Sequence, residues 1–278
     1  MKIYKKTTFL VVALILGITS INAKEMKKEL KTILDLGKQM SSMRNMLETY
    51  ALVATDVEYK EPEKRLEDSM KEYEEVLDFI DKNLKDKDIE ASIKASRKAW
   101  APVKKAFLSA KNHHKTINKG SKHDSIHDKM IDEGIFIHSN IRSVIKELAK
   151  MKAHIIEKQK IKDSTELNAA IEIAASSQRL SAHYMMKMWG LPDPTIQEHW
   201  DNGVKIYTDS IAILKKSAYY KDPKFKKELD SSEKNLNYFT TVIMFDDKYV
   251  PVVVHEKAQL AFKSANNMSK TILIQITK

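Results

Sequence analysis

Residues 62–83, PEKRLEDSMKEYEEVLDFIDKN, carry the pattern that decides the fold of this chain. Their apolar residues recur at intervals of three and four, which places them on one face of an α-helix, whereas a strand would alternate every second residue. Pro62 stands at the start, where its fixed φ and missing N–H suit a first helical turn. We therefore predict an amphipathic helix whose apolar stripe consists of Leu66, Met70, Tyr73, Leu77 and Ile80.

The same spacing continues through the rest of the chain, interrupted by residues that start or stop helices. Pro194, Pro223 and Pro251 each precede a long periodic segment, and Gly190 follows one. The run VPVVVHEK at 250–257 is the one β-like segment, and a helix begun by its proline fits it about as well, so no strand is required. We predict an all-α protein with helices over residues 25–57, 61–83, 87–117, 122–158, 164–190, 194–218, 222–247 and 251–276.

The composition of the 278-residue chain excludes several classes of protein. It has no cysteine, which rules out disulfides, thiolate zinc sites, iron–sulfur clusters and cysteine nucleophiles. Its six glycines form neither of the phosphate-binding motifs of nucleotide enzymes, and no G-x-S-x-G motif is present. We therefore expect a protein that is not an enzyme and that needs no cofactor.

The N-terminus has the layout of an export signal. Lysines within the first six residues precede an apolar run, Phe9–Ile18, and the small residue Ala23 follows after a short polar stretch. The run is shorter than the roughly 20 residues needed to span a bilayer, although an uncleaved anchor is the alternative interpretation. We predict that residues 1–23 are a cleaved signal peptide and that the mature protein is periplasmic.

The formal net charge of +10 points to an anionic partner such as nucleic acid, acidic lipid or a small oxyanion. The basic residues are interspersed with acidic ones, as in KEYEEVLDFIDKNLKDKD at 71–88, which is typical of a solvated helix face. The sequence has no basic stripe with interleaved aromatic residues of the kind that binds nucleic acid. We therefore expect a small anionic ligand and no nucleic-acid partner.

A short motif occurs twice and divides the chain into two halves. Ser41–Arg44 (SSMR) in the first predicted helix recurs as Ser176–Arg179 (SSQR) in the fifth, 135 residues later. Repetition at a fixed offset indicates two structural units of the same kind. Because each half holds four predicted helices, we predict two tandem antiparallel four-helix bundles, at 24–158 and 159–278.

The fifth helix, IEIAASSQRLSAHYMMKMWGL at 171–191, resembles the first helix of the PilJ-type domain. That domain is the N-terminal ligand-binding region of type IV pili methyl-accepting chemotaxis transducers, and it is similar to the sensor module of nitrate/nitrite-responsive histidine kinases. The shared pattern is a pair of small residues followed by arginine, and Ser41–Arg44 carries it in the first half. The segment Trp100–Val103 (WAPV) also resembles a Trp-x-Pro segment of PilJ-type helices. The resemblance implies two sensory modules that act on a membrane sensor or chemotaxis transducer.

The resemblance also implies a ligand. In the similar kinases, matching arginines from two subunits grip one nitrate, and a planar guanidinium suits a planar oxyanion because it offers paired donors. Arg44 and Arg179 lie in equivalent helices of the two halves, so a pseudo-dimer within one chain would bring them together. We expect a nitrate- or nitrite-like ligand, bound by Arg44, Arg179, Ser41, Ser42, Met43, Ser177 and Gln178.

Two alternative functions remain open from the sequence. His123 and His127 lie four residues apart on one predicted helix face, a spacing that can bind zinc, nickel or copper. A zinc protease is excluded because Asp124 stands where that motif has glutamate. The methionines spaced by three from Met40 fit an apolar core better than a copper site. The other alternative is a structural or interaction module of the cell envelope that binds no small ligand.

Overall fold

The computed structural model describes most of the chain. Its backbone is described for residues 4–117, 123–242 and 249–276, and its side chains for residues 28–109, 130–242 and 249–276. Within these ranges all regular structure is helical, and no strand is present. The elements are α1 (Tyr4–Ala54), α2 (Pro62–Asn83), α3 (Lys87–Ile117), α4 (His123–Lys158), α5 (Ser164–Trp189), α6 (Thr195–Lys216), the 3-10 helix η1 (Ala218–Lys221), α7 (Pro223–Val242) and α8 (Pro251–Ile276).

Where they fall on described residues, the predicted helix bounds agree with these to within a few residues, except at the start of the chain; the predicted start at 122 and the predicted end at 247 lie outside the described residues. At the start of the chain, α1 begins at Tyr4 instead of residue 25, because no proline separates the apolar run from the amphipathic segment that follows it. The β-like run at 250–257 is helical from Pro251 onward. The side chains of residues 1–23 lie outside the described ones. Among the residues that are described, no helix is both long and apolar enough to cross a membrane.

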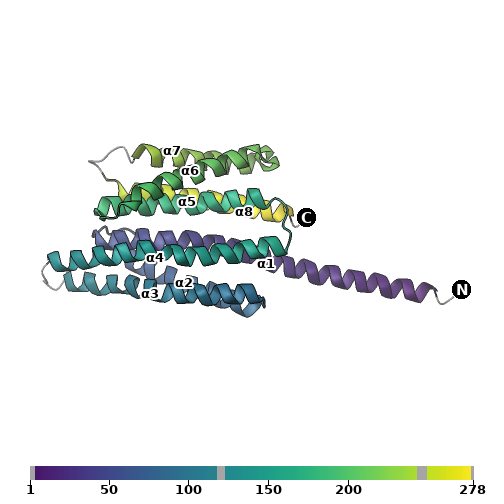
Figure 1. Ribbon diagram of the computed structural model, residues 1–278. Helices are drawn as coiled ribbons and strands as arrows, with labels where there is room; N and C mark the ends of the chain where they lie inside the picture. The colour runs from purple at the N-terminus through teal and green to yellow at the C-terminus, as the bar shows by residue number, and fades with distance from the viewer. Residues whose placement is uncertain (1–3, 118–122, 243–248, 277–278) are drawn as a thin grey trace.

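The helices pack as a layered stack in which α1 and α5 lie near the middle. Helix α1 contacts α2 and α4, and α3 contacts α2 and α4. In the second half α5 contacts α6 and α8, and α7 likewise contacts α6 and α8. The main contact between the halves is made by α1 and α5. In Figure 1, α2 with α3 and α6 with α7 lie at opposite edges of the stack.

Helices α1 and α5 run in the same direction and approach closely. Gly37 lies opposite Ile171, and eight residues further along α1 the Asn45 amide donates to Oε1 of Gln178 at 3.0 Å. A Cβ on Gly37 would lie 2.9 Å from Cγ2 of Ile171, so only glycine permits this separation. Helices α1 and α5 are thus held side by side, with the two occurrences of the motif at similar heights.

Gly134 on α4 provides a test of this packing. A Cβ at this position would lie 2.6 Å from two ring carbons of Trp189, which is itself buried. Helix propensity favours alanine over glycine by about 1 kcal/mol, but overpacking a core usually costs about 1–3 kcal/mol. We expect Gly134→Ala to lower the free energy of unfolding in a urea titration, whereas a stability gain would show that Trp189 can move aside. Ser143→Ala, at an exposed position on the same helix, is the control.

Candidate functional site

A pocket of about 320 Å³ opens between α1, α4, α5 and α6, beside the contact of α1 with α5. Its volume lies in the range typical of small-molecule sites. Helix α4 contributes the longest wall, because its lining residues recur every three or four positions over three turns. The pocket is lined by Arg44, Leu47, His138, Ile141, Arg142, Ile145, Lys146, Ala149, Arg179, Ala182, His183, His199 and Asn202.

The charged groups at this pocket all have the same sign. Arg44, Arg142, Lys146 and Arg179 line it, and none of the described residues that line it is aspartate or glutamate. Arg142 and Lys146 are exposed, whereas Arg44 and Arg179 are half-buried as whole residues, with guanidinium groups deep in the protein. Like charges gathered in a low-dielectric wall concentrate a positive potential, which attracts anions.

Arg44 reaches across from α1 to α5. Its Nη1 donates to the carbonyl oxygen of Ala175 at 3.2 Å. Burial and the nearby charge of Arg179 lower the pKa of Arg44 to about 9, although Glu172 acts in the opposite direction. Arg44 therefore remains charged at neutral pH, although its surroundings disfavour the charged form. A bound anion would stabilise that charged form.

Arg179 enters the same pocket from α5. Burial lowers its pKa, Glu172 raises it, and the charge of Arg142 lowers it further. Its Nη1 is buried and has no hydrogen-bond partner in the protein. A buried donor without a hydrogen-bond partner destabilises the folded protein by about 1–3 kcal/mol, and by more when the group is charged. This guanidinium thus offers a free donor to a ligand.

Three histidines form one end of the pocket. The ring centroids of His138 and His183 are 5.4 Å apart, and that of His199 lies 5.6 and 5.8 Å from them. His138 Nδ1 lies 2.6 Å from Oδ2 of Asp193, and its Nε2 lies 3.3 Å from Nε2 of His183. A carboxylate only accepts, so Nδ1 of His138 donates to Asp193 and, in the neutral ring, Nε2 accepts from His183.

The surroundings keep these histidines neutral. Burial lowers the pKa of all three rings, most strongly that of His183, and the neighbouring rings and arginines lower the pKa of His183 and His199 further. Asp193 opposes this at His138 by a hydrogen bond and by its charge. Burial alone would raise the pKa of Asp193, but hydrogen bonds from Thr195 and His138 lower it to about 2. The pocket end therefore holds uncharged rings beside permanent cations.

The residues expected from the repeated motif do not all reach this pocket. Arg44 and Arg179 do, whereas Ser41, Ser42 and Gln178 line a second, polar pocket of about 340 Å³ on the other side of the α1–α5 contact. The division follows from helix geometry, because neighbouring residues on a helix differ by about 100° in direction. The two remaining residues, Met43 and Ser177, are buried in the protein interior, where the Ser177 hydroxyl donates to the carbonyl oxygen of Ala174 at 2.8 Å.

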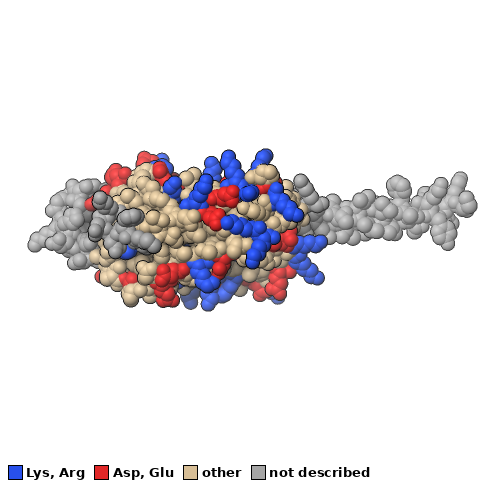
Figure 2. All heavy atoms as spheres, turned by 90° about the horizontal axis from the view of Figure 1, so that it is seen from above, with Lys and Arg blue, Asp and Glu red and all other residues tan. Residues whose placement is uncertain are grey.

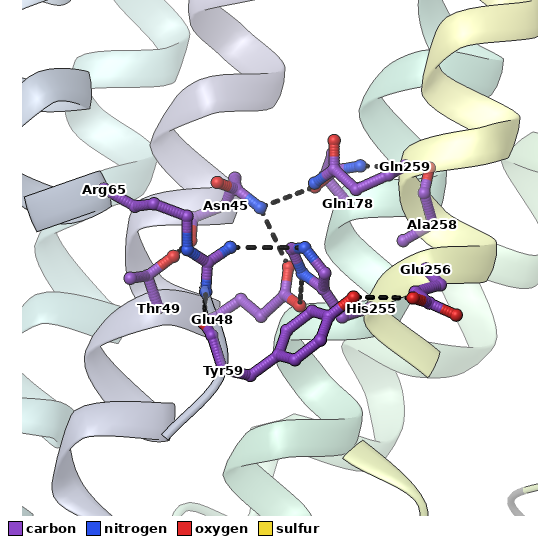
Figure 3. A network of polar contacts seen from close by, with 10 residues as sticks. All are labelled: Asn45, Glu48, Thr49, Tyr59, Arg65, Gln178, His255, Glu256, Ala258 and Gln259. Carbon is purple, nitrogen blue, oxygen red and sulfur yellow. Dashed lines mark hydrogen bonds and ion pairs between the residues drawn. The ribbon is translucent and has the colours of Figure 1, made fainter. Parts of the chain in front are cut away.

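A buried polar network joins the halves on that second side (Figure 3). His255 Nδ1 lies 2.7 Å from Oε1 of Glu48, and both side chains are almost completely buried. Arg65 Nη1 lies 3.2 Å from His255 Nε2. Because arginine can only donate, His255 accepts at Nε2 and donates to Glu48 at Nδ1. The other oxygen of Glu48 accepts from Asn45, which also donates to Gln178.

The sequence patterns considered for metals lead to no described site. His123 and His127 lie outside the residues whose side chains are described. Among the described side chains, one group has metal-like spacing, formed by Asp86, Asp88 and His154. Lys158 lies 2.8 Å from Asp86, and its hydrogen bond lowers the Asp86 pKa, followed by that of His154. This group is therefore an ion-pair cluster. The methionines considered for copper, Met40, Met43 and Met46, are buried core residues.

Several residues of the cationic pocket were not predicted from the sequence. Arg142 and Lys146 of α4 and His199 of α6 come from helices that show no motif. His183 had a detectable signal, because it follows Arg179 by four residues and so lies on the same face of α5. Pairing across helices, however, was not encoded in any local pattern.

On the face shown in Figure 2, Lys and Arg side chains lie among Asp and Glu side chains, as the sequence pattern predicted. The pocket differs from this face, because four of its lining residues are Lys or Arg and none of the described residues that line it is Asp or Glu.

No family model, curated protein or solved structure matches the chain.

Proposed function

We propose that this protein is an exported, PilJ-type sensory protein that binds a small oxyanion, with nitrate and nitrite as the first candidates, between Arg44 and Arg179. The observation that carries the proposal is that the two motif arginines, 135 residues apart, line one pocket that has no lining carboxylate. The free Nη1 of Arg179 supports it, because this donor needs an acceptor.

The energetics favour an anion at this point. Two buried cations repel each other and lose hydration, and each is stabilised when a shared anion lies between them. Charge-assisted hydrogen bonds contribute about 1.5–3 kcal/mol each. A planar oxyanion can accept from two guanidinium groups at once, which would link α1 of one half to α5 of the other.

The proposed architecture is a fused pair of four-helix bundles. The contacts of α1 to α4 among themselves, of α5 to α8 among themselves, and of α1 with α5 support this interpretation. A ligand held at the α1–α5 contact would bias how the two bundles pack. Helix shifts of about 1–2 Å at such interfaces are a common signalling device. In this proposal a membrane sensor or chemotaxis transducer reads that shift, after export directed by residues 1–23.

Thermal unfolding in the presence of anions tests the proposal. Nitrate or nitrite at about 100 times its dissociation constant should add about 2.7 kcal/mol to the stability of residues 24–278. Arg44→Gln and Arg179→Gln should each abolish the increase in melting temperature. Arg97→Gln is the matched control, because Arg97 lies on α3 and pairs with Asp78 at the surface.

Two outcomes would contradict anion binding at this site. One is a melting temperature that no anion in a panel of nitrate, nitrite, sulfate and carboxylates changes. The other is an anion-dependent increase that both arginine variants retain while their circular dichroism shows native helix content. The first outcome would favour a structural module of the envelope that binds no small ligand.

A further inference from the structure

Buried positions of α4 and α8 correspond at a constant offset of 117 residues. His138 of the cationic pocket corresponds in this way to His255 of the buried network, and both rings are buried. The match extends along both helices, and most buried positions of one helix correspond to buried positions of the other. The corresponding buried pairs are Ile137 and Val254, Ile141 and Ala258, Val144 and Ala261, Leu148 and Ala265, Met151 and Met268, and Ile155 and Ile272.

The other helices of the pocket correspond in the same manner. The 135-residue offset that relates Arg44 to Arg179 also relates Glu48 on α1 to His183 on α5. Between α2 and α6 the offset is 134, as shown by the buried pairs Tyr73 and Tyr207, Leu77 and Ile211, and Ile80 and Leu214. The same offset relates Arg65 to His199. The three histidines of the pocket thus occupy the positions of Glu48, Arg65 and His255 in the network.

The network position contains its own anion. The Glu48 carboxylate is fully buried and accepts from His255 at 2.7 Å and from Asn45 at 3.0 Å, while Arg65 donates to the other nitrogen of the histidine (Figure 3). A positive guanidinium and a negative carboxylate are therefore joined through one imidazole. This side of the α1–α5 contact is neutralised by the protein itself.

The pocket position lacks that carboxylate. His183 stands where the network has Glu48, and the permanent charges that line the pocket are Arg44, Arg142, Lys146 and Arg179. Two nearby carboxylates lie outside the set of lining residues: Asp193 hydrogen-bonds to His138, and Glu172 raises the pKa of both Arg44 and Arg179 by its charge. By comparison with the network, the missing component is an oxyanion, which a ligand would supply.

The size and lining of the pocket define the rest of the ligand. A volume of about 320 Å³ is roughly ten times the share of one water molecule in the liquid, so a four-atom oxyanion would fill a small part of it. The wall from His138 to Ala149 on α4 is about 16 Å long. Apolar side chains also line the pocket, namely Ile141, Ile145 and Ala149 of α4, Leu47 of α1 and Ala182 of α5.

We propose that the cationic pocket binds one organic anion per chain, with a carboxylate held by Arg44 and Arg179 and an apolar body along α4, while Glu48 closes the equivalent position across the α1–α5 contact. The inference rests on the proposed anion-binding function and narrows it to a class of ligand. It also fixes the stoichiometry, because the buried Glu48 carboxylate already occupies the related position, whereas none of the described residues that line the cationic pocket is aspartate or glutamate.

Isothermal titration calorimetry on residues 24–278 tests this inference with hexanoate, acetate, nitrate and hexan-1-ol as probes. Hexanoate should bind at one molecule per chain and at least tenfold more tightly than acetate or nitrate, because its methylene groups leave water. Hexan-1-ol, which has the same apolar body and no charge, should not bind at the concentrations that saturate with hexanoate. Ala149→Leu, which fills part of the apolar wall, should reduce hexanoate affinity at least fivefold and reduce acetate affinity by less.

The outcomes separate the inference from the function on which it rests. Equal affinities for hexanoate, acetate and nitrate, all lost in Arg179→Gln, would overturn the organic ligand and support the simple oxyanion. Binding of two hexanoate molecules per chain would overturn the inference that Glu48 closes the equivalent position. Absence of binding for all three anions would overturn both proposals. Loss of hexanoate affinity in both Arg44→Gln and Arg179→Gln, with native melting curves, would support the inference.

Discussion

Replacement of Glu48 by alanine is expected to reduce the free energy of unfolding by about 3–5 kcal/mol, which is the usual loss when one partner is removed from a buried charged pair. Glu48 has no exposed surface, and both its oxygens accept hydrogen bonds. In the variant, the His255 Nδ1 proton loses its acceptor and the charge of Arg65 loses its counter-ion. The remaining polar groups are then buried without compensation.

Chemical unfolding monitored by circular dichroism measures this decrease in the free energy of unfolding. Two further variants show which interaction of Glu48 causes it. Glu48→Gln keeps an acceptor for His255 and should lose less than Glu48→Ala. Glu256→Ala removes a carboxylate that is exposed and accepts from Tyr59 at 2.6 Å, so it should change stability by less than about 1 kcal/mol. A loss in Glu48→Ala no larger than that of Glu256→Ala would show that the network contributes little to joining the halves.

The helices were predictable from the sequence because their signals are local. Each apolar stripe and each initiating proline acts within one helix, and the stripe from Leu66 to Ile80 is buried as predicted. The start of α1 at Tyr4 was not predicted, because a stretch with export features is also a good helix former. Local helix propensity thus accounts for the helical content, but it does not distinguish a predicted signal peptide from a helix of the folded protein.

The candidate site was only partly predictable because it depends on packing between helices. The repeat indicated Arg44 and Arg179, since both lie in equivalent motifs. It could not show that Asn45, the residue after Arg44, points to the other side of α5 and donates a hydrogen bond to Gln178. Nor did any pattern connect Glu48 with His255, which are 207 residues apart. Such pairs arise from the way in which the two halves are placed together.

Stability should fall as the pH is lowered from 6.5 to 5, because of the histidines in the cationic pocket. Burial, then the neighbouring rings and Arg179, hold the pKa of His183 well below its ordinary value. Below about pH 6.5 the unfolded chain takes up a proton at this residue that the folded chain does not. The unfolded state is then favoured by about 1.4 kcal/mol per pH unit, or about 2 kcal/mol at pH 5, and His138 and His199 add in the same direction.

Unfolding free energies measured from pH 8 to pH 5 in urea check this expectation. The wild-type value should be constant above pH 7 and decline below it, and the decline should be shallower in His183→Gln by about 2 kcal/mol at pH 5. An anion bound in the pocket raises the pKa of all three rings by its charge, so saturating hexanoate should also reduce the decline. Parallel pH profiles for the wild type and His183→Gln would mean that His183 is protonated as readily in the folded protein as in the unfolded chain. In that case the surrounding groups stabilise the protonated ring of His183. The positive potential in the pocket would then be weaker than its four charged lining residues indicate.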